Sequence, residues 1–488
     1  MQFGESQQLV QADSIADIDQ GQFGEQTFLT DKYAFIASRE VVSGNTSSRF
    51  EGAVYAYKTT DNGKTWTFKQ KIVPSNSHDM MFYGSVGKGP ITAYGNTLVV
   101  SAKGEYEHVD TASGFKGVGA VYIYTTSDDG ETWSFSQKLK PTTNLKQYLQ
   151  FGISVSLDGN ILAVSVGGRD VYVNGQAYEN YGSVILYEKT NGTFTEKQEI
   201  EGDTSIQNGA NFGQKVVIKG DTLVIGESTF TPENTTTKVG RVSVWKPSNN
   251  VGTSGVFTRQ ELIYLPKNAG QTESHPSLGI QFGHSLAFDG NILAIGAPFH
   301  NKSDGVVCIF KTNNNGYDWV EKKIIYAYGN VHTRNHAVGS LIMGRVNNDS
   351  WMNWANKFGY RLALEGNILA VAAMKDQYYT SKTSANQNTG SIRIFKTNDD
   401  GETWIGGDED EFTGVVNYTK DYEANTYIGQ YSLSMKNGTI LVDNARFSSP
   451  GKNRNGRVFV FKQGYTPPGP VSDEEQKLID LSVQTADI

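Results

Sequence analysis

FGISVSLDGNILAVSVGG, residues 151–168, sets two short alternating apolar runs on either side of an Asp-Gly-Asn turn. Related stretches are FGQKVVIKGDTLVIGE from Phe212, FGHSLAFDGNILAIGAP from Phe282 and FGYRLALEGNILAVAA from Phe358. Period-two alternation interrupted by Gly, Asn and Asp is typical of strands joined by tight turns. The chain therefore repeats one β-unit, and this repetition indicates the fold.

The unit occurs seven times when the chain is aligned on an aromatic or aliphatic residue followed by Gly. The units begin near Phe23, Tyr83, Phe151, Phe212, Phe282, Phe358 and, in degenerate form, Ile428. Each reads as four strands, and a four-stranded sheet cannot bury both of its faces unless neighbouring sheets stack on it. The sequence predicts an all-β fold, a seven-bladed β-propeller of four-stranded antiparallel blades over residues 1–464.

The two ends of this region are expected to share one blade. The last unit has its third strand, GRVFVFKQ from Gly456, and then continues into YTPPGP, where proline removes the backbone donors that a fourth strand needs. The first residues, FGESQQLVQADS from Phe3, have the layout of the outer strand FTEKQEIEGDTS from Phe194. We expect residues 3–10 to pair with residues 456–462 and to close the ring.

A second pattern precedes several outer strands. TTDNGKTW from Thr59, TSDDGETW from Thr126 and TNDDGETW from Thr397 share Asp, Gly and Trp at fixed spacing, and TNNNGYDW from Thr312 is a diverged copy. We call these four segments the aspartate turns. The Asp is expected to accept hydrogen bonds from its own turn while the Trp packs between strands. We therefore interpret these residues as structural: Asp61, Trp66, Asp128, Trp133, Asp399 and Trp404.

Two resemblances follow from these motifs. The repeats resemble the FG-GAP units of integrin α-subunit propellers, most fully at Phe282-Gly283 with Gly296-Ala297-Pro298, and the aspartate turns resemble the Asp-box of sialidases. The first resemblance implies a recognition or adhesion role. Integrin blades that bind calcium carry an Asp-rich loop between their first two strands, whereas this chain has only short turns there. We expect no metal and no cofactor.

Composition limits the partners. The formal net charge is -8 and no run of Lys and Arg interleaves with aromatic residues, so we expect no nucleic acid. The single cysteine, Cys308, lies in the strand-like VVCIF and is expected to be a buried structural thiol. The first residues lack the pattern of a secretory signal, and no apolar run is long enough to span a membrane. We expect folding in a cytoplasm and no direct membrane insertion.

The longest and most variable segments are the second-to-third-strand connections and the links between blades. In a propeller both classes emerge on one face, which we call the loop face, and functional residues concentrate in such loops. Aromatic side chains stack on sugars or fill protein hot spots, and Arg binds carboxylates. The candidate binding residues are Trp351, Trp354, Tyr378, Tyr379, Tyr106, His108, Tyr172, Tyr178, Arg169 and Arg334. The alternative for Trp351 and Trp354 is that they anchor a long insertion to its own blade.

The C-terminal segment differs in character. Residues 465–471 read as a Pro-rich linker, and residues 472–488 predict a short helical or extended tail with a capping box at Ser472 and Glu475. An isolated short helix needs a surface to pack on. The tail either folds back on the propeller or docks on another subunit through Leu478, Ile479, Leu481 and Val483.

Together these features favour a non-enzymatic recognition or structural protein. The leading hypothesis is a component of a virus or bacteriophage particle, assembled in the cytoplasm, that presents its loop face to a glycan, a host surface or a neighbouring subunit. A cell-surface or secreted FG-GAP adhesin is the second hypothesis. A sialidase-like glycoside hydrolase is the third, and it requires carboxylates that converge at the axis; the candidates are Glu105, Asp110, Asp170, Glu227 and Asp376.

Overall fold

The structure, a computed structural model, describes most of the repeats and omits many of the variable connections. The described residues are 3–9, 22–38, 52–73, 90–110, 114–142, 148–173, 176–203, 211–233, 236–248, 255–269, 279–326, 357–375, 378–381, 384–386, 390–406, 415–416, 427–444 and 456–464. The linker and the tail, residues 465–488, lie outside them.

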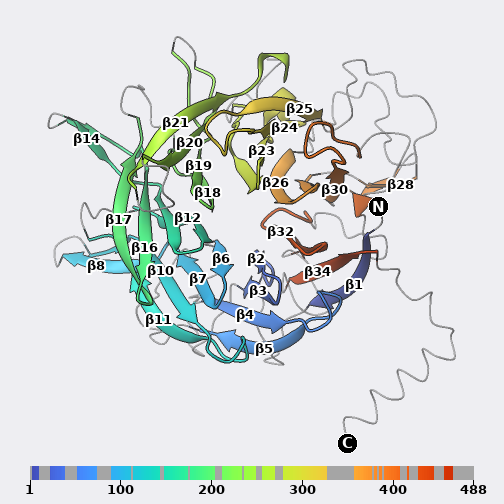
Figure 1. Cartoon of the computed structure of the whole chain (residues 1–488), viewed down its shortest axis with the longest axis horizontal. Helices are drawn as coiled ribbons and strands as arrows, with labels where there is room; N and C mark the ends of the chain where they lie inside the picture. The colour runs from blue at the N-terminus through green and yellow to red at the C-terminus, as the bar shows by residue number, and fades with distance from the viewer. Residues whose placement is uncertain are drawn as a thin grey trace, which may run out of the picture.

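Seven four-stranded antiparallel sheets form the blades, as the repeats predict (Figure 1). Blade 1 contains β2 (Gln26–Leu29), β3 (Tyr33–Ser38), β4 (Ala53–Lys58) and β5 (Thr67–Ile72). Blade 2 contains β6 (Ile91–Tyr94), β7 (Thr97–Ala102), β10 (Ala120–Thr125) and β11 (Ser134–Leu139). Blade 3 contains β12 (Phe151–Asp158), β13 (Ile161–Val166), β16 (Ser183–Thr190) and β17 (Thr193–Glu201).

The remaining blades follow the same order. Blade 4 contains β18 (Lys215–Lys219), β19 (Thr222–Glu227), β20 (Arg241–Pro247) and β21 (Phe257–Tyr264). Blade 5 contains β22 (Ser285–Asp289), β23 (Ile292–Ala297), β24 (Val306–Lys311) and β25 (Val320–Tyr326). Blade 6 contains β26 (Phe358–Glu365), β27 (Ile368–Ala373), β30 (Ser391–Lys396) and β31 (Val415–Val416). The helical elements in the described residues are η2 (Lys267–Ala269) and α1 (His300–Ser303).

Blade 7 joins both ends of the propeller. It contains β32 (Leu433–Lys436), β33 (Thr439–Asn444) and β34 (Arg457–Gln463), and β1 (Phe3–Leu9) is its outermost strand. β1 pairs antiparallel with β34, from Phe3 opposite Gln463 to Leu9 opposite Val458, with one bulge near Glu5. Figure 1 shows the blue first strand beside the red last one. The predicted closure through the N-terminal strand is confirmed.

The apolar core lies in the seams between blades. Seven hydrophobic clusters occupy the seven blade-to-blade seams, including the seam between blades 7 and 1. The innermost strands of successive blades also contact one another around the whole ring, and β2 meets β32 to complete it. Fully burying one large aromatic or aliphatic side chain contributes about 1.5–3 kcal/mol. Each blade is therefore stabilised by the apolar side chains that it buries against its two neighbouring blades. Cys308 is buried in one of these seams, and burial raises the pKa of its thiol.

The Phe-Gly dipeptide has a packing role at these seams. Phe358 is fully buried and forms a parallel bridge with Gly305, which directly precedes the third strand of the preceding blade. Gly305 has a φ of +90°, and a Cβ on it would lie 2.1 Å from the Phe358 carbonyl oxygen. Only glycine permits both this conformation and this approach. The repeating Phe-Gly and the Gly at the third strand are therefore two halves of one contact.

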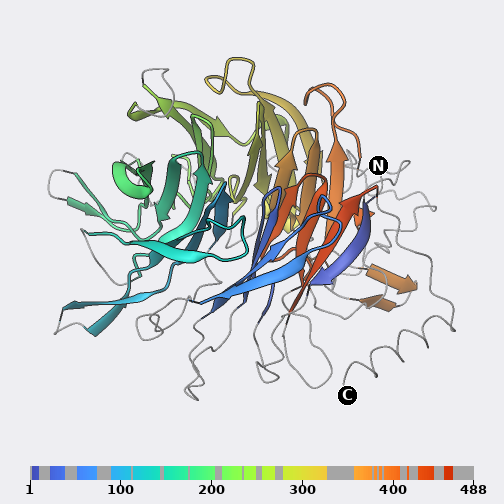
Figure 2. The same cartoon turned by 60° about the horizontal axis from the view of Figure 1, so that its bottom comes forward.

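Three two-stranded hairpins extend from second-to-third-strand connections. They are β8 (Tyr106–Asp110) with β9 (Gly114–Gly117), β14 (Val171–Val173) with β15 (Gln176–Tyr178), and β28 (Tyr378–Ser381) with β29 (Ser384–Asn386). Figure 1 places all three at the outer edge of the ring of blades, and Figure 2 shows the β8–β9 hairpin at the lower left and the β28–β29 hairpin at the lower right. The hairpins give the loop face ordered extensions.

Candidate functional site

The aspartate turns are closed by their own side chains. Asp128 accepts hydrogen bonds from the Thr132 backbone N–H at 2.9 Å, the Thr132 hydroxyl at 2.5 Å and the Thr126 hydroxyl at 2.8 Å. These bonds hold the pKa of Asp128 near 2, well below the usual 3.8. Asp61 and Asp399 make the same set of bonds in their own turns. The side-chain hydrogen bonds of these three carboxylates thus lie within their own turns.

The tryptophan of each aspartate turn packs toward the preceding blade. The Trp133 ring of blade 2 meets the Tyr33 and Phe35 rings of blade 1 edge to face, at centroid distances of 5.4 and 5.1 Å. Trp66, Trp319 and Trp404 are also buried. Edge-to-face contacts add to the area that these rings bury. The turn therefore fixes one end of a seam.

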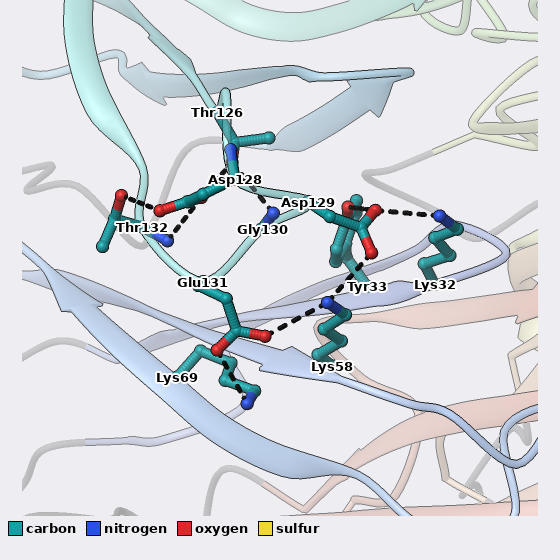
Figure 3. A network of polar contacts seen from close by, with 10 residues as sticks. All are labelled: Lys32, Tyr33, Lys58, Lys69, Thr126, Asp128, Asp129, Gly130, Glu131 and Thr132. Carbon is teal, nitrogen blue, oxygen red and sulfur yellow. Dashed lines mark hydrogen bonds and ion pairs between the residues drawn. The ribbon is translucent and has the colours of Figure 1, made fainter.

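The second acidic residue of the turn reaches across the same seam. Asp129 accepts from Lys32 Nζ at 2.8 Å and from the Tyr33 hydroxyl at 2.9 Å, and Lys58 Nζ lies 3.0 Å from its other oxygen (Figure 3). Hydrogen bonds from Lys32, Lys58 and Tyr33 hold the pKa of Asp129 well below its usual range. Burial, together with this hydrogen bond, raises the pKa of Tyr33 to about 12. The contacts connect blade 2 to blade 1.

Glu131 continues this connection, and blade 6 repeats it. Glu131 pairs with Lys58 at 3.1 Å and with Lys69 at 2.8 Å, as Figure 3 shows. In the aspartate turn of blade 6, Glu402 pairs with Lys311 and Lys322 of blade 5 at 3.0 and 2.8 Å. Exposed pairs contribute little singly, but networks of several charges contribute more. This end of the disc, which we call the turn face, is engaged in holding blades together.

Pairs of hydrogen bonds between a glutamine side chain and the backbone of the next blade join successive outer strands. We call this arrangement the glutamine clamp, and it was not predicted from the sequence. Gln70 of blade 1 donates from Nε2 to the Trp133 carbonyl at 3.2 Å and accepts from the Trp133 N–H at 2.5 Å. The same two-bond arrangement joins Gln7 to Trp66, Gln137 to Phe194 and Gln198 to Phe257. Each of these glutamines lies two residues before the last buried aliphatic residue of its strand, as in FKQKI and FSQKL. This spacing is the sequence signal from which the glutamine clamp could have been predicted.

Six of the ten candidate binding residues lie in the three hairpins of the loop face. Tyr106 and His108 are in β8, Tyr172 in β14, Tyr178 in β15, and Tyr378 and Tyr379 in β28. The Tyr172 side chain belongs to the exposed large hydrophobic residues, at 56% exposure. The structure therefore groups these residues by element, one hairpin in each of blades 2, 3 and 6.

The other candidates are placed differently. Arg169 is only 2% exposed, and its Nε and Nη2 atoms donate to Glu199 at 2.7 and 3.0 Å. Ser183 donates to the same carboxylate at 2.6 Å, so Arg169 forms an internal ion pair in blade 3. Trp351, Trp354, Arg334 and the tail residues Leu478, Ile479, Leu481 and Val483 lie outside the described residues, so these predictions remain untested.

The carboxylates considered for a hydrolase have partners within the protein. Glu105 accepts from the Tyr122 hydroxyl at 2.7 Å and pairs with Lys138. Glu227 is 1% exposed and accepts from Arg241 Nε at 2.7 Å; burial raises its pKa while the Arg241 charge opposes that rise.

Asp170 accepts from the backbone N–H of Asn180 at 2.9 Å. The side chain of Asp110 and the whole of Asp376 lie outside the description.

The described part of the chain contains no group of three or more His, Cys, Asp or Glu side chains arranged to hold a metal ion. Nor does any helix there have the length and apolarity that crossing a membrane requires.

Comparisons with known proteins gave similar structures but no similar sequence. No protein-family model matches the chain, and no curated protein sequence matches it. Solved structures similar to it include Sqt1 of Saccharomyces cerevisiae, with a TM-score of 0.45 and 10% identity over 95% of this chain and 100% of that one. A protein of Bacteroides uniformis provisionally named a 6-phosphogluconolactonase has a TM-score of 0.42 and 10% identity over 78% and 83% of the two chains. A Lactobacillus plantarum protein gives 0.43 and 10% over the same shares. The strand pairing of this chain itself defines it as a seven-bladed β-propeller.

Proposed function

We propose that this propeller is a non-enzymatic recognition or structural protein of the FG-GAP type, which presents its loop face to a glycan, a host surface or a neighbouring subunit. The observation that carries the proposal is the set of three ordered hairpins, β8–β9, β14–β15 and β28–β29, all inserted in second-to-third-strand connections. They hold six aromatic or histidine candidates on a closed and therefore rigid ring. Rigid scaffolds that display variable loops are suited to binding.

The contrast between the two faces supports this choice. Three aspartate turns on the turn face are closed by their own Asp and Thr side chains, and those of blades 2 and 6 also carry ion pairs to the neighbouring blade. The aspartate turns of the turn face are thus engaged in internal contacts, whereas Tyr172 on the loop face is largely exposed. Exposed aromatic rings are the side chains most often used for sugar stacking and as interface anchors.

The test compares two exposed tyrosines on opposite faces. Tyr172 is 56% exposed on a loop-face hairpin, and Tyr94 is 50% exposed beside a first-to-second-strand turn. A glycan array and a host-cell binding assay should show weaker binding by Tyr172→Ala and unchanged binding by Tyr94→Ala. Trp351→Ala and Trp354→Ala extend the test to the long insertion. Equal binding by the natural chain and all four variants would contradict the proposal that the loop face binds the ligand.

The biological setting is a separate part of the proposal. We propose a virus or bacteriophage particle, with other particle proteins as partners and the C-terminal tail as a docking segment; a cell-surface or secreted adhesin is the alternative. Copurification with capsid or tail proteins supports the first, and a leader encoded upstream supports the second. Hydrolysis of a fluorogenic sialoside that is lost on mutating an axial carboxylate would replace both with a glycosidase.

A further inference from the structure

A group of basic side chains lies where the innermost strands of blades 4, 5 and 6 begin. Lys215 and Arg361 occupy the same place in the repeat, three residues after Phe212 and Phe358. His284 follows the Phe-Gly of blade 5, and Lys357 precedes that of blade 6. Because β18, β22 and β26 are innermost strands that contact one another in succession, these residues lie at the loop-face end of the axis. We call the four residues the axial cationic cluster.

Aromatic contacts hold part of the cluster together. The His284 ring lies 4.8 Å from the Tyr360 ring across the seam between blades 5 and 6. Arg361 lies over the same Tyr360 ring, with its guanidinium carbon 4.9 Å from the centroid. Lys357 Nζ is 4.8 Å from the centroid of Phe299 and 5.8 Å from that of Tyr360. Three cationic or titratable side chains therefore surround one tyrosine.

No carboxylate neutralises this charge within the described part of the chain. Arg361 donates to two backbone carbonyls, those of Tyr431 at 2.9 Å and Tyr360 at 3.1 Å, and Lys215 and Lys357 have no ion pair there. His284 Nε2 is buried and has no hydrogen-bond partner among the described residues, while Nδ1 faces Gln281 Oε1 at 3.2 Å. Desolvated cations without counterions are unfavourable.

The pKa directions agree with this picture. Burial and then the Arg361 charge lower the pKa of Lys215 to about 8. Burial and then the Lys375 charge lower that of Lys357 to about 8. Burial followed by the charges of Arg361, Lys357 and Lys215 lowers the pKa of His284 to about 3.

Lys215 and Arg361 lie at corresponding positions near the starts of β18 and β26, and β22 lies between these two strands around the axis. No carboxylate is among the causes of the three pKa shifts.

We propose that the axial cationic cluster binds an oxyanion, the carboxylate or phosphate group of a ligand that enters the axis from the loop face. Arg361 retains donors for a planar oxyanion, Lys215 and Lys357 supply mobile positive charge, and His284 Nε2 supplies a further polar contact. The inference is independent of the hairpin residues invoked above. It predicts a second binding position at the centre of the same face.

The experiment titrates the purified full chain with inorganic phosphate and, separately, with acetate, using chloride at equal ionic strength as the reference. Isothermal calorimetry measures affinity and thermal unfolding measures stability. Lys215→Met should weaken binding of the preferred anion roughly tenfold or more, since one lost charged contact has that scale. The same change should raise the melting temperature without anion, because it removes an uncompensated charge; a merely structural lysine would lower it.

Lys219→Met is the matched control, since Lys219 ends the same strand on the turn face with its side chain 47% exposed. It should leave anion affinity unchanged, as should Tyr172→Ala, which tests the hairpins only. Tighter binding of phosphate or of acetate identifies the source of the oxyanion. The proposal is overturned if neither anion stabilises the protein beyond chloride, or if Lys215→Met binds as the natural chain does.

Discussion

Glu261 occupies the position at which glutamine clamps the next blade in four other outer strands. It accepts from the Trp319 N–H at 2.8 Å, but an ionised carboxylate has no donor for the Trp319 carbonyl. Burial raises the pKa of Glu261 above its usual 4.5, although the Trp319 bond opposes the rise. This seam therefore has only one of the two hydrogen bonds of the clamp, and a titratable carboxyl group replaces the glutamine amide.

We expect Glu261→Gln to stabilise the protein at neutral pH by about 0.5–1.5 kcal/mol, the net contribution of one hydrogen bond. A carboxyl whose folded pKa is raised favours the folded state at low pH, and this contribution is lost as pH rises through the folded pKa. In urea unfolding experiments from pH 4 to pH 8, the free energy of unfolding should therefore fall less with rising pH for Glu261→Gln than for the natural chain. Gln198→Glu places a carboxylate at the clamp position of another seam, so its free energy of unfolding should fall more with rising pH than that of the natural chain. Equal pH dependence in the natural chain and both variants would contradict this role of Glu261.

Among the elements, the aspartate turns offer a reciprocal pair of variants. Asp128 bonds Thr132 in one turn, whereas in the diverged turn Asn314 donates to Asp318 Oδ2 at 2.5 Å. Each pairing has one carboxylate and one neutral partner. The diverged turn therefore preserves the bond by exchanging which residue carries the charge.

Asp128→Asn should lower the melting temperature at pH 7, because the turn loses a charged acceptor. The pKa of Asp128 is depressed to about 2, so its contribution is present above the usual 3.8 and disappears as pH falls through about 2. The difference in melting temperature between the natural chain and the variant should shrink over that interval. Asn314→Asp should also lower the melting temperature at pH 7, because it sets two carboxylates face to face, and the protein should recover as they are protonated in acid. A constant deficit for Asp128→Asn across the range would show that the charge is not the cause.

For the whole molecule, the strongest expectation concerns the strand that closes the ring. Deleting residues 1–12 removes β1 from β34, takes Leu9 out of the seam between blades 7 and 1, and breaks the clamp from Gln7 to Trp66. We expect the melting temperature to fall by roughly 5 °C or more, since loss of a buried leucine alone costs about 2–5 kcal/mol. Ser6→Ala retains the strand and its backbone pairing and should melt close to the natural chain. An unchanged melting temperature after the deletion would mean that closure contributes nothing to stability.

The propeller architecture could be predicted because the same strand pattern occurs in each of the seven repeats of the sequence. Phe151-Gly152 and its counterparts mark the innermost strands, and YTPPGP after β34 shows that the outer strand must come from elsewhere. Single positions were less predictable. Arg169 was proposed for binding, but the fold brings it to Glu199, which lies 30 residues away on the outer strand of its own blade.

The axial cationic cluster was missed for a related reason. Lys215, His284 and Arg361 carry no distinctive pattern within their own repeats, and only the stacking of blades 4, 5 and 6 brings their strands together. A periodic sequence reports well on contacts that recur in every unit. It says little about a site assembled from four residues that differ among three units.

The pairing of β1 with β34 also has a consequence for biosynthesis. Ser6 and its partner Val460 are 454 positions apart. At ribosomal rates of about 5–20 residues per second, β1 emerges roughly 20–90 s before its partner strand is made. Throughout that interval the nascent chain carries an uncovered strand at one end and an unsealed seam on blade 1, both of which invite aggregation. A denatured full-length chain faces no such delay, so yield during translation should depend on holding chaperones more than refolding from urea does.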